Sequence, residues 1–186
     1  ATLSDGGIVI QQASDITTLN LTLDDVGPAS STPNENVLID IAGTGVTTAN
    51  VTSGNDSFVV LSNSGNSLTS LELFGTGSMA LGTLPTSVTN INGTAASANL
   101  TLTIGSSGSN VIKGGIGNDA ITLAGGINDV DLGAGNDTVT TTSNLVAGDR
   151  INGGDGIDTF EVIQTGLATI PSMANLVSFE NFRLQD

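Results

Sequence analysis

The chain has 186 residues, enough for one large domain or two small ones, and its 38% hydrophobic content can fill a modest core. Eighteen acidic residues face three basic ones, so a formal net charge of −15 would repel nucleic-acid phosphates and anionic membranes, and a metal cation is the natural counter-charge. The absence of Cys and His excludes disulfides, thiolate or histidine zinc sites, and Ser-His or Cys-His catalytic pairs.

Residues 1–104 alternate apolar and polar side chains in short runs, with Gly, Pro and Asn between them. This pattern predicts β-strands rather than helices, most clearly at residues 19–23, 37–41, 71–73 and 100–104. We expect a strand-rich β region here, which either forms a sandwich or continues the solenoid predicted for the residues that follow. The sequence contains no apolar run of about 18 residues, so we do not expect membrane insertion. The start at Ala1, without an initiator Met or a signal-peptide block, suggests a processed product or a fragment.

Residues 105–161 repeat with a period of nine residues. Cut from Gly105, the units are GSSGSNVIK, GGIGNDAIT, LAGGINDVD and LGAGNDTVT; after three extra residues, 141–143, the phase returns as NLVAGDRIN and GGDGIDTFE. Position six is Asn or Asp, and position eight is apolar. Each unit can therefore form a glycine-rich turn and a short strand. We expect the position-eight side chains to form the core: Ile112, Ile121, Val130, Val139, Ile151 and Phe160.

Two units make one coil of a parallel β-helix, so equivalent turns recur after 18 residues and stack at the strand spacing of about 4.8 Å. The position-six residues then divide into two edges. One edge carries Asp119, Asp137 and Asp158. The other carries Asn110, Asn128 and Asp149.

Stacked carboxylates need a cation. Two of them about 5 Å apart repel by about 3 kcal/mol at an effective dielectric constant of 20. Calcium accepts about six to eight oxygen ligands in flexible geometry, whereas magnesium prefers a tighter octahedron and retained waters. We expect calcium mainly at the Asp edge. Sites at the other edge, which carries Asn110, Asn128 and Asp149, should be weaker or empty because the amide oxygens of Asn110 and Asn128 are neutral. The glycines let turn carbonyls crowd around an ion; the glycines predicted for the site are Gly114, Gly115, Gly117, Gly133, Gly135, Gly153 and Gly156.

These units resemble the RTX, or hemolysin-type, calcium-binding repeat, GGxGxDxUx, which forms a parallel β-roll. Residues 114–122 and 153–161 match every specified position, residues 132–140 lack only the first glycine, and residues 123–131 carry Asn128 in place of Asp. The resemblance covers about a third of the chain. The simpler alternative is that these Asp and Asn residues only form turns.

Segments 68–81, 84–88 and 177–182, together with the Thr, Ser and Asn content, look like bacterial surface-layer proteins that carry RTX repeats. The resemblance implies a secreted, non-enzymatic structural protein that self-associates into a lattice at the cell surface, with a cell-surface glycan or lipopolysaccharide as a further partner through the parent protein. The alternatives are a calcium-stabilised adhesin or carbohydrate-binding module, and an RTX accessory domain of a secreted hydrolase. Residues 162–186 would cap the roll, with Phe179 and Phe182 as apolar plugs.

Several acidic residues fall outside this pattern. Asp129, Asp131 and Asp155 lie off position six, and we expect them to be solvated. The segment 54–58, Gly-Asn-Asp-Ser-Phe, matches the end of a repeat unit but has no neighbouring unit, which favours a plain turn. Arg150 beside Asp149 is expected to be solvated or paired with a carboxylate.

Overall fold

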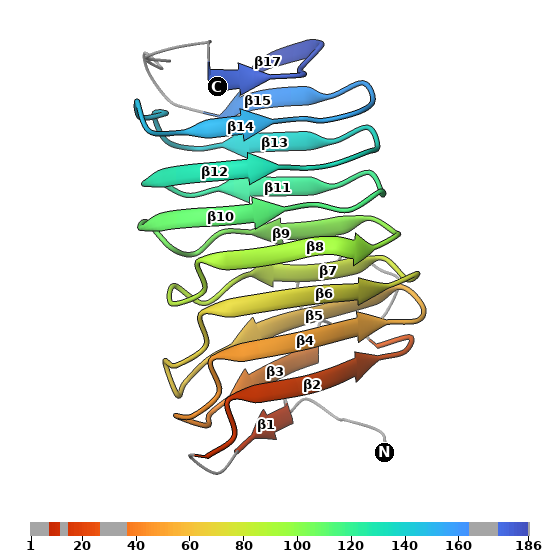
Figure 1. Cartoon of the computed structure of the whole chain (residues 1–186), viewed down its shortest axis with the longest axis vertical. Helices are drawn as coiled ribbons and strands as arrows, with labels where there is room; N and C mark the ends of the chain where they lie inside the picture. The colour runs from red at the N-terminus through yellow and green to blue at the C-terminus, as the bar shows by residue number, and fades with distance from the viewer. Residues whose placement is uncertain (1–7, 12–14, 27–36, 164–174, 186) are drawn as a thin grey trace.

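The computed structural model describes residues 8–11, 15–26, 37–163 and 175–185. Over these residues the chain winds as a β-solenoid through two parallel sheets (Figure 1). Odd-numbered strands form one sheet and even-numbered strands form the other, so each coil contributes a strand to both. The predicted all-β, parallel solenoid is confirmed. The described residues include no helix long and apolar enough to cross a membrane.

The strands are short and follow one another regularly along the chain. The nine-stranded sheet contains β1 (Ile8–Ile10), β3 (Val37–Ile41), β5 (Ser57–Ser62), β7 (Met79–Thr83), β9 (Leu100–Thr103), β11 (Ala120–Leu123), β13 (Thr138–Thr141), β15 (Thr159–Ile163) and β17 (Asn181–Gln185). The eight-stranded sheet contains β2 (Thr18–Leu23), β4 (Thr48–Ser53), β6 (Ser70–Gly75), β8 (Asn90–Ala96), β10 (Ser109–Lys113), β12 (Ile127–Asp131), β14 (Arg150–Asn152) and β16 (Leu176–Val177).

The nine-residue period sets the length of a coil. Ile112 pairs with Val130 in one sheet and Ile121 with Val139 in the other, both across the predicted 18 residues. The three inserted residues lengthen the next coil to 21 residues without loss of register, because Val139 still pairs with Phe160. All six position-eight side chains are buried, as predicted: Ile112, Ile121, Val130, Val139, Ile151 and Phe160.

The described strands before residue 105 belong to the same two sheets, so this region continues the solenoid rather than forming a sandwich. The segments predicted as strands correspond to β2, β3, part of β6 and β9. Apolar and polar residues alternate in these strands because every second side chain faces the core. In β6 the side chains of Leu71 and Leu73 are fully buried, whereas those of Ser70 and Glu72 point outward. Coils in this region are longer and less regular, with separations of 20 to 31 residues between paired positions.

Aromatic side chains close the C-terminal end of the core. The ring of Phe179 packs edge-on against Phe160 with 5.6 Å between centroids, and the ring of Phe182 lies 6.3 Å from Phe160. The two predicted plugs thus cover the last core aromatic, although Phe182 stays 51% exposed. Residues 164–174 and 186 of the predicted cap lie outside the described residues.

Candidate metal-binding edge

The three predicted aspartates form one column at a corner of the solenoid. Asp119, Asp137 and Asp158 come directly before strands β11, β13 and β15, and are 1%, 1% and 0% exposed. The backbone N–H of Asp119 donates to Oδ1 of Asp137 at 2.7 Å, and the backbone N–H of Asp137 donates to Oδ1 of Asp158 at 2.8 Å. The carboxylates of Asp137 and Asp158 therefore each accept a hydrogen bond from the aspartate of the coil before, which is the stacking that the period predicts.

A fourth carboxylate continues this column and was missed by the sequence analysis. Oε2 of Glu180 accepts the backbone N–H of Asp158 at 2.8 Å. The sequence spacing could have identified Glu180. It precedes Phe182, an inward position, by two residues, just as Asp158 precedes Phe160. At the other end, Leu100 donates its N–H to Oδ1 of Asp119 at 2.8 Å. The acidic column thus starts at Asp119 and ends at Glu180.

The second oxygens of these carboxylates are less well satisfied. Oδ2 of Asp119 accepts the N–H of Gly115 at 3.0 Å, whereas Oδ2 of Asp137 and Oδ2 of Asp158 are buried without a hydrogen-bond partner in the described part of the chain. An unpaired buried carboxylate oxygen is costly, so these two atoms call for a proton or a cation.

The pKa values respond to this environment. Burial raises the pKa of Asp119, opposed by the N–H groups of Gly115 and Leu100. Burial, and then the negative charges of Asp119 and Asp158, raise the pKa of Asp137 to about 7 despite the hydrogen bond from the Asp119 N–H. The middle aspartate is consequently poised between a protonated and an ionised state near neutral pH.

The seven predicted turn glycines lie where neighbouring coils touch. A Cβ on Gly114 would stand 2.5 Å from Oδ2 of Asp119, and one on Gly153 would stand 2.6 Å from Oδ2 of Asp158. The same Cβ atoms would also stand 2.2 Å from the carbonyl oxygens of Leu132 and Ser178 in the following coil, so only glycine fits at these two positions. At the other five positions a Cβ would run into the backbone of the preceding coil: Gly115, Gly117, Gly133, Gly135 and Gly156.

The possible ligands along the Asp edge are all oxygen atoms. Hard oxygen atoms from carboxylates and turn carbonyls are what calcium prefers, and the buried Oδ2 atoms of Asp137 and Asp158 add the negative charge that it requires. Among the described residues no three carboxylates converge on one point, so an ion would be shared between two neighbouring turns. The carbonyls of Gly115 and Gly133 accept N–H groups of the next coil, which leaves one lone pair on each for an ion.

Hydrogen bonds link the side chains of the opposite edge to one another and to the backbone. Nδ2 of Asn110 donates to Oδ1 of Asn128 at 2.9 Å, and the backbone N–H of Asn128 donates to Oδ1 of Asp149 at 2.7 Å. Oδ2 of Asp149 accepts the N–H of Val146 at 2.6 Å. On this edge Oδ1 of Asn110 is buried and has no hydrogen-bond partner among the described residues. This amide edge therefore has less need of an ion than the Asp edge.

Comparisons with protein-family models, curated proteins and solved structures found no match to this chain. The residues of the two edges are therefore the basis for the function proposed below.

The same corner holds uncharged residues in the earlier coils. Ser57 pairs with Met79, Met79 pairs with Leu100, and all three are buried. The lone repeat-like segment 54–58 puts Ser57, not Asp56, in the buried column. Oδ1 of Asp56 instead accepts the backbone N–H of Ser78 at 2.9 Å, as a turn-forming residue does.

Exposed asparagines form a second ladder beside the acidic column, which the sequence analysis also missed. The N–H of Asn118 donates to Oδ1 of Asn99 at 2.8 Å, that of Asn136 to Oδ1 of Asn118 at 2.7 Å, and that of Ile157 to Oδ1 of Asn136 at 2.9 Å. The recurring Gly-Asn-Asp at 117–119 and 135–137 carried the signal. These neutral bonds join the turns without any ion.

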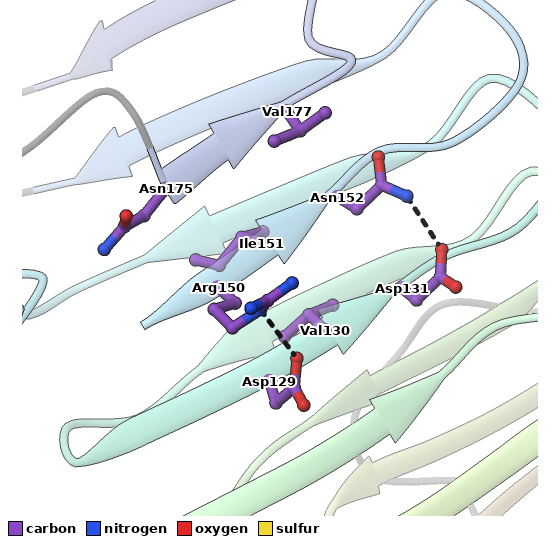
Figure 2. A pocket seen from close by; sticks show the side chains of 8 residues that line it. All are labelled: Asp129, Val130, Asp131, Arg150, Ile151, Asn152, Asn175 and Val177. Atoms are coloured by element: carbon purple, nitrogen blue, oxygen red, sulfur yellow. Dashed lines mark hydrogen bonds and ion pairs between the residues drawn. The ribbon is translucent and has the colours of Figure 1, made fainter. Parts of the chain in front are cut away.

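The three acidic residues that were predicted to be solvated, Asp129, Asp131 and Asp155, lie on the surface. The side chain of Asp129 is 63% exposed and lies 3.9 Å from Arg150 (Figure 2). Oδ1 of Asp131 accepts Nδ2 of Asn152 at 3.0 Å. These side chains border a shallow pocket of about 330 Å³ on the outer face of β12, β14 and β16. Asp155 is also exposed, and its backbone joins the turns.

Proposed function

We propose that this chain is a calcium-binding structural β-solenoid of a secreted bacterial protein, and that it assembles with further copies into a cell-surface layer. The role is mechanical rather than catalytic. Calcium held between the stacked turns of the Asp edge would complete the fold, and the RTX-like spacing of residues 105–161 supports this proposal.

One observation carries the proposal: the column of Asp119, Asp137 and Asp158 is buried, and two of its carboxylate oxygens have no partner among the described residues. Without a cation, ionisation of this column opposes folding because the charges are desolvated and repel one another. A divalent ion shared between two carboxylates makes the net electrostatic energy of the column favourable. The unfolded chain has no preformed site, so the free energy of calcium binding adds directly to the free energy of folding.

This linkage connects folding to location. Where calcium is scarce, the acidic coils remain loose; where calcium is plentiful, as outside a cell, they close onto the ions. A chain with a formal charge of −15 also keeps copies apart until cations are present.

The test is a calcium titration of the EGTA-treated chain, followed by circular dichroism and by size-exclusion chromatography with light scattering. We expect a gain of β-structure that calcium produces and magnesium does not, accompanied by growth in particle mass. Identical spectra and masses with and without calcium would mean that the Gly-Asp units are ordinary turns.

A glycan-binding adhesin is the second candidate function, and the outer-face pocket favours it. Asp129, Asp131, Arg150 and Asn152 place carboxylate, guanidinium and amide groups in one register, and such groups can hydrogen-bond to sugar hydroxyls. Isothermal titration with bacterial surface polysaccharide decides between the two roles. Saturable binding by a calcium-loaded monomer, lost in Arg150→Ala, would favour the adhesin.

A further inference from the structure

The turn before β17 contacts Asp158 through three hydrogen bonds. Oε2 of Glu180 accepts the backbone N–H of Asp158 at 2.8 Å. In return, the backbone N–H groups of Glu180 and Asn181 donate to the carbonyl of Asp158 at 3.2 and 3.0 Å. These bonds hold the carboxylate of Glu180 next to Asp158, where β17 begins to pair with β15 (Figure 1).

A backbone carbonyl of the same turn lies beside the carboxylate of Asp158. Ser178 has a φ of +56°, a left-handed conformation that is uncommon for a residue with a side chain. A Cβ added to Gly153 would meet both the Ser178 carbonyl oxygen and Oδ2 of Asp158, so these two oxygen atoms lie close to the same point. Asp158 is 0% exposed, and its Oδ2 has no hydrogen-bond partner among the described residues. This buried oxygen calls for a positively charged partner.

None of the basic side chains supplies that partner. The chain has three of them, and all three belong to its described part. Both arginines pair with other carboxylates, those of Glu161 and Asp129. Lys113 ends β10, which belongs to the other sheet. The negative charges of Asp158 and Glu180 therefore call for a cation from solution or a proton.

We propose that a divalent cation binds between Asp158 and Glu180 and holds β17 against the last coil. The ligands of this cap site are the carboxylates of Asp158 and Glu180 and the carbonyl of Ser178, with water in the remaining positions. All of them are hard oxygen atoms, which calcium accepts in flexible geometry. A proton could neutralise only one of the two carboxylates, whereas a divalent ion neutralises both. The inference rests on the proposed function, because it takes calcium as the ion.

The cap site lies outside the glycine-rich repeat. Residues 178–180 read Ser-Phe-Glu, with neither the glycines nor the aspartate of a repeat unit. Asp158 is buried in the solenoid, whereas Glu180 is exposed, so an ion can reach the site from solvent. One ligand thus belongs to the last complete repeat and the others to the turn before β17. An ion shared between them joins the two segments.

The ion would also fix the aromatic cover of the core. Phe179 stands between the two turn ligands in the chain, and its ring packs 5.6 Å from that of Phe160. Among the described strands, β17 pairs with β15 alone, so it has fewer backbone hydrogen bonds to hold it than an interior strand. Calcium at the cap site should therefore determine how firmly β17 and Phe179 stay docked.

A matched pair of variants tests the cap site in calcium. Glu180→Gln removes the charge but keeps an oxygen that can accept the Asp158 N–H. Glu72→Gln is the control, because Glu72 lies on the outer face of β6 and its hydrogen bond from Nδ2 of Asn92 needs only an oxygen. Hydrogen exchange with mass spectrometry compares residues 181–185 of β17 with residues 138–141 of β13, and native mass spectrometry counts the bound calcium ions.

We expect Glu180→Gln to bind one calcium ion fewer per chain than the wild type. At free calcium about 100 times the dissociation constant of the cap site, its residues 181–185 should exchange up to about 100-fold faster than in the wild type. Residues 138–141 should keep their protection, and Glu72→Gln should match the wild type in both measurements.

Other outcomes overturn the cap site. Equal ion counts for Glu180→Gln and the wild type would contradict it, even with faster exchange, because Glu180 would then act only through its hydrogen bond. An equal loss of protection in Glu72→Gln would contradict it as well. The wild type alone gives a second test: protection of residues 181–185 should rise as calcium is titrated into the EGTA-treated chain, and unchanged protection would refute the cap site.

Circular dichroism of the same samples separates this inference from the proposed function. A calcium-induced gain of β-structure with equal ion counts in the wild type and Glu180→Gln would refute the cap site and leave calcium-driven folding intact. One ion fewer in Glu180→Gln, without any calcium-induced gain in the wild type, would refute calcium-driven folding and leave the cap site intact.

Discussion

Replacing Asp137 by Asn should change the stability of the chain in opposite directions with and without calcium. In the folded chain the pKa of Asp137 is about 7, against 3.8 for an ordinary aspartate. Because the folded pKa is raised, the stability that this group contributes is fully present below about pH 4 and is lost as the pH rises through about 7. The difference corresponds to about 4 kcal/mol of folding free energy.

Asparagine removes the charge and preserves the hydrogen bond. Its Oδ1 can accept the N–H of Asp119 as the carboxylate does. The amide edge shows what Nδ2 can do in this position, because Nδ2 of Asn128 donates to the carbonyls of Ala124 and Gly126 at 3.4 and 3.3 Å. In EGTA at pH 8 the variant should therefore be more stable than the wild type, by up to about 4 kcal/mol. In calcium it should be less stable, because the neutral amide attracts the ion weakly.

The assay is urea unfolding, followed by circular dichroism from pH 5 to 8.5, in EGTA and in millimolar calcium. In EGTA, the free energy of unfolding of the wild type minus that of the variant should fall by about 1.4 kcal/mol per pH unit up to about pH 7. Asp129→Asn is the control, since Asp129 has a 63% exposed side chain on the outer face and should show neither effect. Parallel pH curves for wild type and Asp137→Asn in EGTA would refute the reasoning.

Two further substitutions probe the turns and the amide edge. Gly135→Ala should lower the free energy of unfolding by at least about 2 kcal/mol with or without calcium, because φ is +142° there and a Cβ would meet the carbonyl of Gly117. Gly125→Ala, whose Cβ would find only Oγ of Ser143 at 3.9 Å, should cost far less in the same urea titration, and equal losses would contradict the steric argument. Asn128→Asp places a carboxylate beside Asp149, so the chain should lose about 3 kcal/mol in EGTA at pH 8. Calcium should restore most of this loss, and a loss that calcium leaves unchanged would show that the amide edge cannot hold an ion.

The sequence was sufficient to predict the coil of residues 105–161, because a nine-residue period fixes which side chains face inward. Ile112 and Phe160 are buried at position eight, and Asp119 and Asp137 stack at position six, as the period requires. Of the three inserted residues, Thr141 ends strand β13 and residues 142–143 form a bend outside the strands, so the phase on either side was sufficient to predict the register.

Other features depend on distances that no period reveals. The earlier coils vary in length and lack the Gly-Asp turn, so alternation alone could not decide between a sandwich and a solenoid. Glu180 was missed because its unit has no glycine turn before it. Which carboxylate oxygens find a partner depends on single N–H groups, such as that of Gly115, and only the folded coils position these.

The change in the buried corner column from Leu100 to Asp119 divides the solenoid into two parts that should form in order. Coils up to β9 fill this corner with the uncharged residues Ser57, Met79 and Leu100, so their packing needs no counter-ion. Their last strand then presents a finished edge, including the Leu100 N–H that receives Asp119. This edge can act as a template onto which the acidic coils wind one at a time as cations arrive, because each coil contacts only its neighbours.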